Sequence, residues 1–127
     1  MIEIKMLTIV NSMEVLKRLS ESKIRGRTAY KIAKILKRVD EEYGLFQDAR
    51  RKLILECAKK DENGEPVADE NGNVSISEEN ISMFNEEINK LLETTVNIDT
   101  DKIHLDEIEQ IDFTPSDIIM IEDFIEE

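Results

Sequence analysis

Apolar residues recur every three or four positions over a long stretch without proline, from about residue 28 to residue 60. The residues at this spacing are Ile32, Leu36, Val39, Tyr43, Phe46, Leu53 and Cys57. This spacing keeps one helical face apolar, with Arg50 as its one misfit, so the sequence predicts a long helix at 28–60. Such a helix reaches roughly 45–50 Å. Part of it should project or pack against another helix, as in a coiled coil. Gly44 inside it indicates a bend or a close approach of another backbone.

A turn-rich stretch at 61–77 follows the long helix. It contains the sequence Asp-Glu-Asn-Gly twice, at 61–64 and 69–72. Asn-Gly pairs favour tight turns, so we expect the first to end the helix and the second to form the tip of a short β-hairpin. Ser77 is expected to cap a second helix at 79–95, where Ile81, Phe84, Ile88 and Leu91 repeat the apolar spacing. The two helices should form an antiparallel hairpin with the turn-rich stretch at its tip.

The remaining elements are predicted at the two ends of the chain. Alternation of Ile2, Ile4 and Met6 with polar residues indicates a strand at 2–10, and Asn11 or Ser12 can cap a short helix at 12–21. Residues 96–99 can return as a strand beside 2–10. A last helix is expected at 115–125, with Thr114 as cap and Pro115 as its first residue. Its apolar surface should dock into the core or into another subunit. The predicted fold is α+β, a single domain over 1–127, with the helical hairpin packed on a small sheet and a short C-terminal helix.

Charge is sorted along the chain. Residues 1–60 hold 15 of the 17 Lys and Arg and 8 of the 29 acids, so this part is near +7 and the rest is near −19. The net charge of −12 disfavours nonspecific adhesion of the whole molecule to nucleic acid or to anionic lipid. The lone Cys57 forms no internal disulfide, and no apolar run approaches the length of a membrane span. We therefore expect a location in the cytoplasm, without membrane contact.

The residues that carry enzyme chemistry are sparse. His104 is the only histidine and Cys57 the only cysteine, which leaves no zinc cluster and no Ser-His-Asp triad. The Asp69 segment lacks the glycine and the bidentate acid that an EF-hand calcium loop requires. The C-terminal acids could supply a carboxylate-only site for Mg²⁺ or Mn²⁺, although a solvated acidic face explains them more simply. We expect a protein that is not an enzyme and that uses no cofactor or metal.

A basic stripe is the best-defined feature of the charge pattern. Residues 22–39 contain seven cations and no acid. On a helix, Arg27, Lys31, Lys34 and Arg38 lie opposite the apolar face, and such a stripe could follow a phosphate backbone. Tyr30 is its only aromatic neighbour, so the sequence favours contact with acids, within the chain or between subunits. Residues 98–127 carry eleven acids and one Lys. The candidate acidic contact region is Asp106, Glu107, Glu109 and Asp112.

Several of these segments resemble a known group of proteins. They are the stretch 27–34 (Arg-Thr-Ala-Tyr-Lys-Ile-Ala-Lys), the stretches 41–43 and 49–54, the Asn-Gly tip and the stretch 84–87. The chain resembles small uncharacterised proteins of tailed phages and prophages of Gram-positive bacteria. The resemblance implies a phage or prophage origin and assigns no active residues.

Three functions follow from these features. The first is a non-enzymatic phage accessory or assembly protein that acts through protein contacts, with a phage or host protein or as a homo-oligomer, in the host cytoplasm or in association with the virion. The second is an acidic inhibitor of a host nucleic-acid-binding or defence enzyme, motivated by the charge after residue 60. The third and weakest is a nucleic-acid binder that uses the basic stripe.

Overall fold

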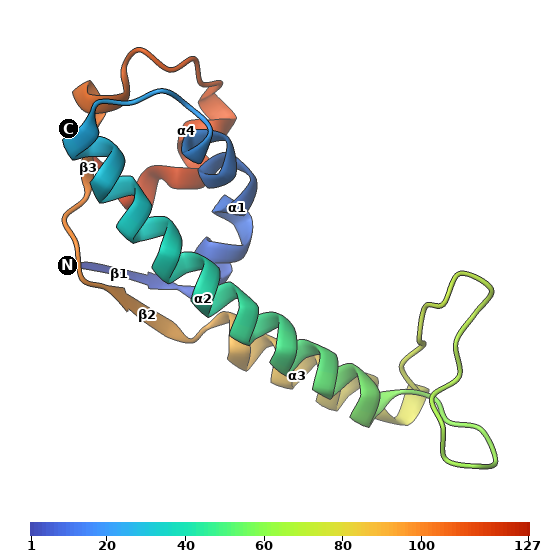
Figure 1. Ribbon diagram of the computed structural model, residues 1–127. Coiled ribbons are helices and arrows are strands. Elements are labelled where there is room, and N and C mark those ends of the chain that lie inside the picture. The colour runs from blue at the N-terminus through green and yellow to red at the C-terminus, as the bar shows by residue number, and fades with distance from the viewer. The chain divides into compact units, whose positions relative to one another are not determined.

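The computed structural model describes residues 1–127 and has an α+β fold (Figure 1). Its α-helices are α1 (Met6–Ser20), α2 (Gly26–Cys57), α3 (Ile81–Leu92) and α4 (Pro115–Ile121). The strands form two small two-stranded sheets. The predicted α+β class with one long helix is confirmed. Residue contacts divide the chain into two compact units, and each is described by itself. Unit 1 comprises Met1–Tyr43 and Thr94–Glu127, and unit 2 comprises Gly44–Glu93.

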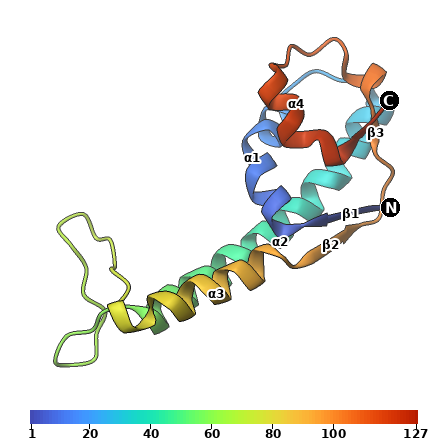
Figure 2. The same cartoon turned by 180° about the vertical axis from the view of Figure 1, so that it is seen from behind.

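The first sheet of unit 1 joins the start of the chain to a distant segment (Figure 2). Strand β1 (Ile2–Lys5) pairs antiparallel with β2 (Thr95–Ile98), so that Ile2 lies opposite Ile98 and Ile4 opposite Val96. All four of these side chains are buried, while the residues between them are exposed. The period of two thus directs one face of this short sheet into the core. The pairing of these two segments is the one that the sequence led us to expect.

The predicted strand at 2–10 is wrong beyond residue 5, because the chain becomes helical at Met6. The apolar residues from Met6 onward also fit helical spacing, and Met6, Ile9, Leu16 and Leu19 are buried on one side of α1. The first N–H of the helix is satisfied by the residue that precedes β2, since the main-chain N–H of Met6 donates to the carbonyl oxygen of Thr94 at 2.9 Å. The chain therefore changes from strand β1 to helix α1 without a connecting loop.

The expected cap at Asn11 or Ser12 is also wrong, since both residues lie inside α1. Ser12 is fully buried, and its hydroxyl donates to the carbonyl oxygen of Ile9 at 3.1 Å. This bond lets a polar side chain sit in the core without an unsatisfied group. Serine is typical of helix caps, but Ser12 lies in the interior of α1.

The C-terminal part of unit 1 follows the predicted start but not the predicted end. Thr114 caps α4 as expected: its hydroxyl oxygen accepts from the N–H of Asp117 at 3.1 Å, and the Asp117 carboxylate accepts from the N–H of Thr114 at 3.1 Å. The expected helix at 115–125 is shorter, because α4 ends at Ile121 and is followed by a 3₁₀ helix at Glu122–Phe124. Strand β4 (Ile125–Glu126) then pairs parallel with β3 (Ile103–His104).

The core of unit 1 is mostly aliphatic. Helix α4 packs on α1, and Ile121 and Phe124 are fully buried (Figure 1). The part of α2 that belongs to this unit buries Ile32, Ile35 and Val39. Leu36, which belongs to the predicted apolar face of this helix, is only half-buried. The other fully buried side chains of the unit are Ile2, Ile9, Leu16, Leu19, Ile98, Ile103 and Ile108.

Unit 2 contains the second half of α2 and the whole of α3, which lie side by side (Figures 1 and 2). This arrangement is consistent with the predicted helical hairpin. Helix α2 ends at Cys57, three residues before the predicted end, because Ala58 forms an antiparallel bridge with Ile76. Helix α3 covers Ile81–Leu92 of the predicted 79–95, since the chain enters β2 at Thr95. Its start follows a 3₁₀ helix at Glu78–Asn80.

Two sequence expectations in unit 2 are corrected. The side chain of Ser77 makes no capping hydrogen bond, and the carbonyl oxygen of Ser77 instead accepts from the N–H of Asn80. Gly44 marks no close approach of another backbone, because a methyl group placed on its Cα would meet nothing within 4 Å. Helix α2 continues through Gly44, where the two units meet in the sequence.

The turn-rich segment of unit 2 forms two loops. The expected hairpin around the second Asn-Gly pair is confirmed, and the first pair forms another such loop instead of ending α2. Antiparallel bridges join Lys60 to Pro66 and Ala68 to Val74, and each bridge closes one Asp-Glu-Asn-Gly turn. In both loops the N–H of the glycine donates to the carbonyl oxygen of the aspartate at 3.0 Å. Gly64 and Gly72 have φ angles of 79° and 81°, and no other residue type has a positive φ. Each loop is thus a type I turn followed by a left-handed glycine.

Candidate interaction surfaces

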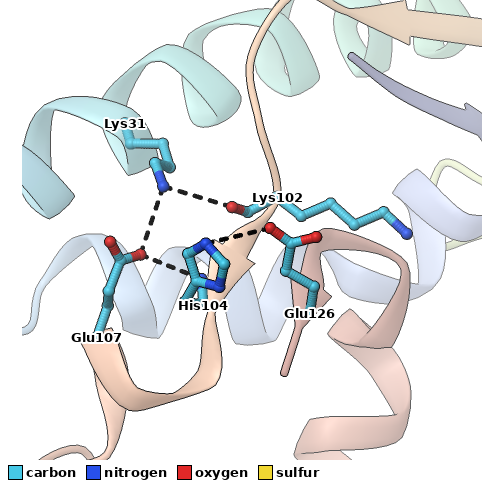
Figure 3. A network of polar contacts seen from close by, with 5 residues as sticks. All are labelled: Lys31, Lys102, His104, Glu107 and Glu126. Carbon is cyan, nitrogen blue, oxygen red and sulfur yellow. Dashed lines mark hydrogen bonds and ion pairs between the residues drawn. The ribbon is translucent and has the colours of Figure 1, made fainter.

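The basic stripe predicted on α2 does not form one continuous surface in unit 1. Lys31 is largely buried, with 20% of its side chain exposed. Its ammonium group lies 3.4 Å from the carbonyl oxygen of Lys102 and 3.4 Å from Oε2 of Glu107 (Figure 3). A lysine in this position needs such partners, because burial of an unpaired ammonium group is costly. Lys31 is therefore held by partners within the unit and is partly shielded from solvent.

Arg38 is also engaged within the chain. Its Nη1 lies 2.7 Å from the Glu42 carboxylate, one helical turn onward, and its Nε donates to the carbonyl oxygen of Asn97 at 3.3 Å. Arg38 thus joins α2 to β2. Of the four predicted residues, Arg27 and Lys34 remain exposed, and the Lys34 ammonium group lies 5.7 Å from the centre of the Tyr30 ring.

In the acidic contact region, the structure brings Glu107 to the stripe. Oε2 of Glu107 accepts from the N–H of His104 at 3.1 Å as well as from Lys31 (Figure 3). Glu107 is the third residue of the 3₁₀ helix at Leu105–Ile108, so its side chain both caps the start of this helix and contacts Lys31 of α2. Nε2 of His104 lies 3.3 Å from Oε1 of Glu126, so β3, β4 and α2 meet in one polar network. The expected contact is therefore made by one acid of the region.

The other three acids of the region are exposed. Asp106 lines an open pocket of about 530 Å³ together with Lys23 and Arg25, which precede α2. Glu109 and Asp112 lie on the surface of the segment between the 3₁₀ helix and α4. The contact between the basic stripe and the acidic region is therefore local, and most of both charges face solvent.

An ion pair that the sequence did not indicate joins α1 to α4. Nη2 of Arg18 donates to Oδ1 of Asp117 at 2.5 Å. This hydrogen bond, together with the one from the N–H of Thr114, lowers the pKa of the Asp117 carboxyl group. Asp117 is also the third helical residue in the cap of α4. Its second partner depends on how α1 packs, for which the sequence carries no signal.

No group of three or more His, Cys, Asp or Glu side chains is arranged to hold a metal ion. Cys57 is fully buried and unpaired with another cysteine. None of the helices is both long enough and apolar enough to cross a membrane.

The helical hairpin of unit 2 leaves many apolar side chains accessible. None of the residues of α3 is buried, although one of its faces is apolar along its whole length. Four large apolar residues of the two helices are strongly exposed: Leu45 (59%), Leu55 (46%), Ile81 (44%) and Met83 (47%). The fully or nearly buried residues of the hairpin and its tip are Phe46, Cys57 and Ala58. This unit has little core of its own.

The two loops at the tip of unit 2 repeat one structure eight residues apart. Oδ1 of Asp61 accepts from the N–H groups of Asn63 and Glu65, at 2.9 and 3.0 Å. Oδ1 of Asp69 accepts from the N–H groups two and four residues onward, each at 2.9 Å. The aspartates are thus used to hold the turns, which supports the choice of a turn over a calcium loop.

Comparison with models of known protein families, with curated protein sequences and with solved structures finds no match.

Proposed function

We propose that this protein is a non-enzymatic phage accessory or assembly protein that acts through protein contacts, and that the helical hairpin of unit 2 makes these contacts. The observation that carries the proposal is the accessibility of apolar side chains on both helices of the hairpin. In particular, Ile81 and Met83 of α3 are exposed, and the other apolar residues of this helix are only half-buried. The phage origin rests on the sequence resemblance alone.

The core of unit 2 is small, with Phe46, Cys57 and Ala58 as its buried residues. Helices of this length gain most of their stability from packing of an apolar face, because short isolated helices are marginal in water. Two helices can shield only one side of each other, so a stable helical layer usually needs further helices. Unit 2 spans 50 residues, and so small a unit rarely buries enough apolar surface alone. A protein partner would supply the missing surface.

The charges of the hairpin support a second copy of the chain as that partner. The second half of α2 carries the consecutive cations Arg50, Arg51 and Lys52. The segment leading into and through α3 carries four acids in two pairs, Glu78, Glu79, Glu86 and Glu87. A second hairpin could lay its α2 beside the α3 of the first, which would place opposite charges next to each other. Such pairing adds specificity to an apolar contact.

Size-exclusion chromatography with light scattering tests this proposal on the full chain. We expect a mass of two or more chains, and we expect the double variant Leu55→Glu with Ile81→Glu to elute as a monomer. Both side chains are exposed, so the substitutions should leave the helical content seen by circular dichroism unchanged. Ile119→Glu is the matched control: it changes a more exposed apolar residue in unit 1 and should keep the wild-type mass. A wild-type monomer at all concentrations would overturn self-association.

A further inference from the structure

A second surface lies on α2 in unit 1 and combines exposed cations with an exposed aromatic ring. Arg27, Tyr30, Lys34 and Lys37 are spaced by three, four and three residues, so they share one face of α2. All four are exposed, and 69% of Tyr30 is accessible to solvent. This set differs from the predicted basic stripe, because Lys31 and Arg38 are engaged by partners within the unit, although Arg38 stays 39% exposed. Tyr30 and Lys37 complete the exposed face.

Beside this surface lies an open pocket of about 460 Å³, bounded by α2 on one side and by the end of β2 on the other. From α2 it is lined by Tyr30, Lys34, Lys37, Arg38 and Glu41, and from the strand side by Asn97, Ile98 and Asp99. The aromatic ring therefore lies beside a pocket lined by cations, an amide and two carboxylates, Glu41 and Asp99. These are the groups that recognise the phosphate, the face and the edge of a nucleotide.

We propose that this surface, consisting of Arg27, Tyr30, Lys34 and Lys37 with the adjoining pocket, binds single-stranded nucleic acid. A base can stack on the exposed Tyr30 ring, while the flanking cations neutralise neighbouring phosphates. The Asn97 amide and the Asp99 carboxylate offer hydrogen-bond partners to the edge of a stacked base. The proposal is independent of the proposed function, because it concerns unit 1 and not the helical hairpin.

Single strands fit this surface better than the other ligands of negative charge. The Lys34 ammonium group lies over the Tyr30 ring, and 69% of Tyr30 stays accessible. An acidic protein segment would use the cations and would not need this accessible part of the ring. A duplex keeps its base faces stacked, so it would also leave the ring unused. The net charge of −12 repels any polyanion at long range, and binding should therefore be weak and sensitive to salt. With three cations on the surface, the slope of log K against log salt should be about −2.

Fluorescence anisotropy with a labelled oligothymidylate, measured from about 50 mM to about 200 mM salt, tests the proposal. We expect binding at low salt that weakens on addition of salt. Tyr30→Ala should weaken binding about fivefold or more, because one stacking contact is lost, whereas Tyr30→Phe should bind like the wild type. The double variant Lys34→Glu with Lys37→Glu should lose at least about tenfold in affinity, since two phosphate contacts become repulsive.

The control must separate this surface from the overall charge. Lys59→Glu with Lys60→Glu makes the same change in net charge on exposed residues of unit 2 and should bind like the wild type. Absence of any anisotropy change at low salt would overturn the proposal. So would an equal loss of affinity in this control, or full affinity of Tyr30→Ala together with competition by polyglutamate, which would identify an acidic protein as the ligand.

Discussion

Arg18 and Asp117 form an ion pair between two helices that are 99 residues apart in the chain. Arg18 lies in the last turn of α1, and Asp117 lies in the first turn of α4. The carboxylate has a separate partner for each oxygen, because Oδ1 accepts from Arg18 and Oδ2 accepts from the N–H of Thr114. One side chain thus both starts α4 and ties it to α1.

This geometry predicts a dependence of stability on pH. The hydrogen bond from Arg18, followed by the one from Thr114, lowers the pKa of Asp117 below its ordinary value of 3.8. A carboxyl group whose pKa is lower in the folded state stabilises the fold above the unfolded pKa, and this contribution is lost as pH falls through the folded pKa. The melting temperature of Asp117→Asn should therefore lie below that of the wild type at pH 6, and the difference should shrink below pH 4. A difference that stays constant down to pH 2 would show that the charge of Asp117 plays no part.

The cap of α4 predicts a second, uncharged effect. Thr114→Ala removes the hydroxyl oxygen that accepts from the N–H of Asp117. The loss of such a cap lowers the free energy of unfolding by about 1 kcal/mol. Urea denaturation followed by circular dichroism measures this change. Thr114→Ser keeps the oxygen and should restore most of the stability, so an equal loss in both variants would contradict the role of the cap.

The cap of α4 could be predicted from sequence because all of its parts lie within four residues. The start of α1 could not, since Met6 satisfies both the strand pattern before it and the helix pattern after it. What decides between them is the carbonyl oxygen of Thr94, which accepts from the N–H of Met6 and lies far along the chain. Local signals therefore located helices and turns, and the boundaries that depend on distant partners were wrong.

The same limit applies to the charged surfaces. The sequence predicted that four cations lie on one face of a helix, and α2 is helical over all four positions. Whether Lys31 or its neighbour Lys34 turns inward depends on where Glu107 and the carbonyl oxygen of Lys102 lie, and this is a property of the packed unit. Tyr30 was known as the aromatic neighbour of the stripe, but its exposure became clear only in the structure.

The contact between Lys31 and Glu107 predicts a specific coupling. The exposed fractions of these side chains are 20% and 26%, so the pair is partly shielded from solvent. A double-mutant cycle with Lys31→Met and Glu107→Gln should give a coupling energy of about 0.5–1 kcal/mol. Asp106→Asn is the control, because Asp106 is exposed and its coupling to Lys31→Met should be near zero. Equal coupling in both cycles would mean that the region acts only through its total charge.

Gly44 predicts a stabilising substitution. It lies in the interior of α2, and an added methyl group would meet nothing within 4 Å. Since glycine is about 1 kcal/mol less favourable than alanine inside a helix, Gly44→Ala should raise the free energy of unfolding by about that amount. Thermal or urea denaturation would show it. A decrease in stability would mean that the helix needs the flexibility of glycine between the two units.

The two loops of unit 2 predict the opposite effect for the same substitution. Gly64 and Gly72 have φ angles near +80°, a region that costs an alanine about 1–2 kcal/mol. Gly64→Ala and Gly72→Ala should therefore each disturb their own loop, and to the same extent, because the two loops share their hydrogen bonds. Amide hydrogen exchange of Asn63 and Asn71 measures this locally, since each N–H donates to the aspartate of its loop. Faster exchange should appear at Asn63 in the first variant and at Asn71 in the second. If either variant accelerated exchange in both loops, the loops would form one cooperative structure rather than two independent turns.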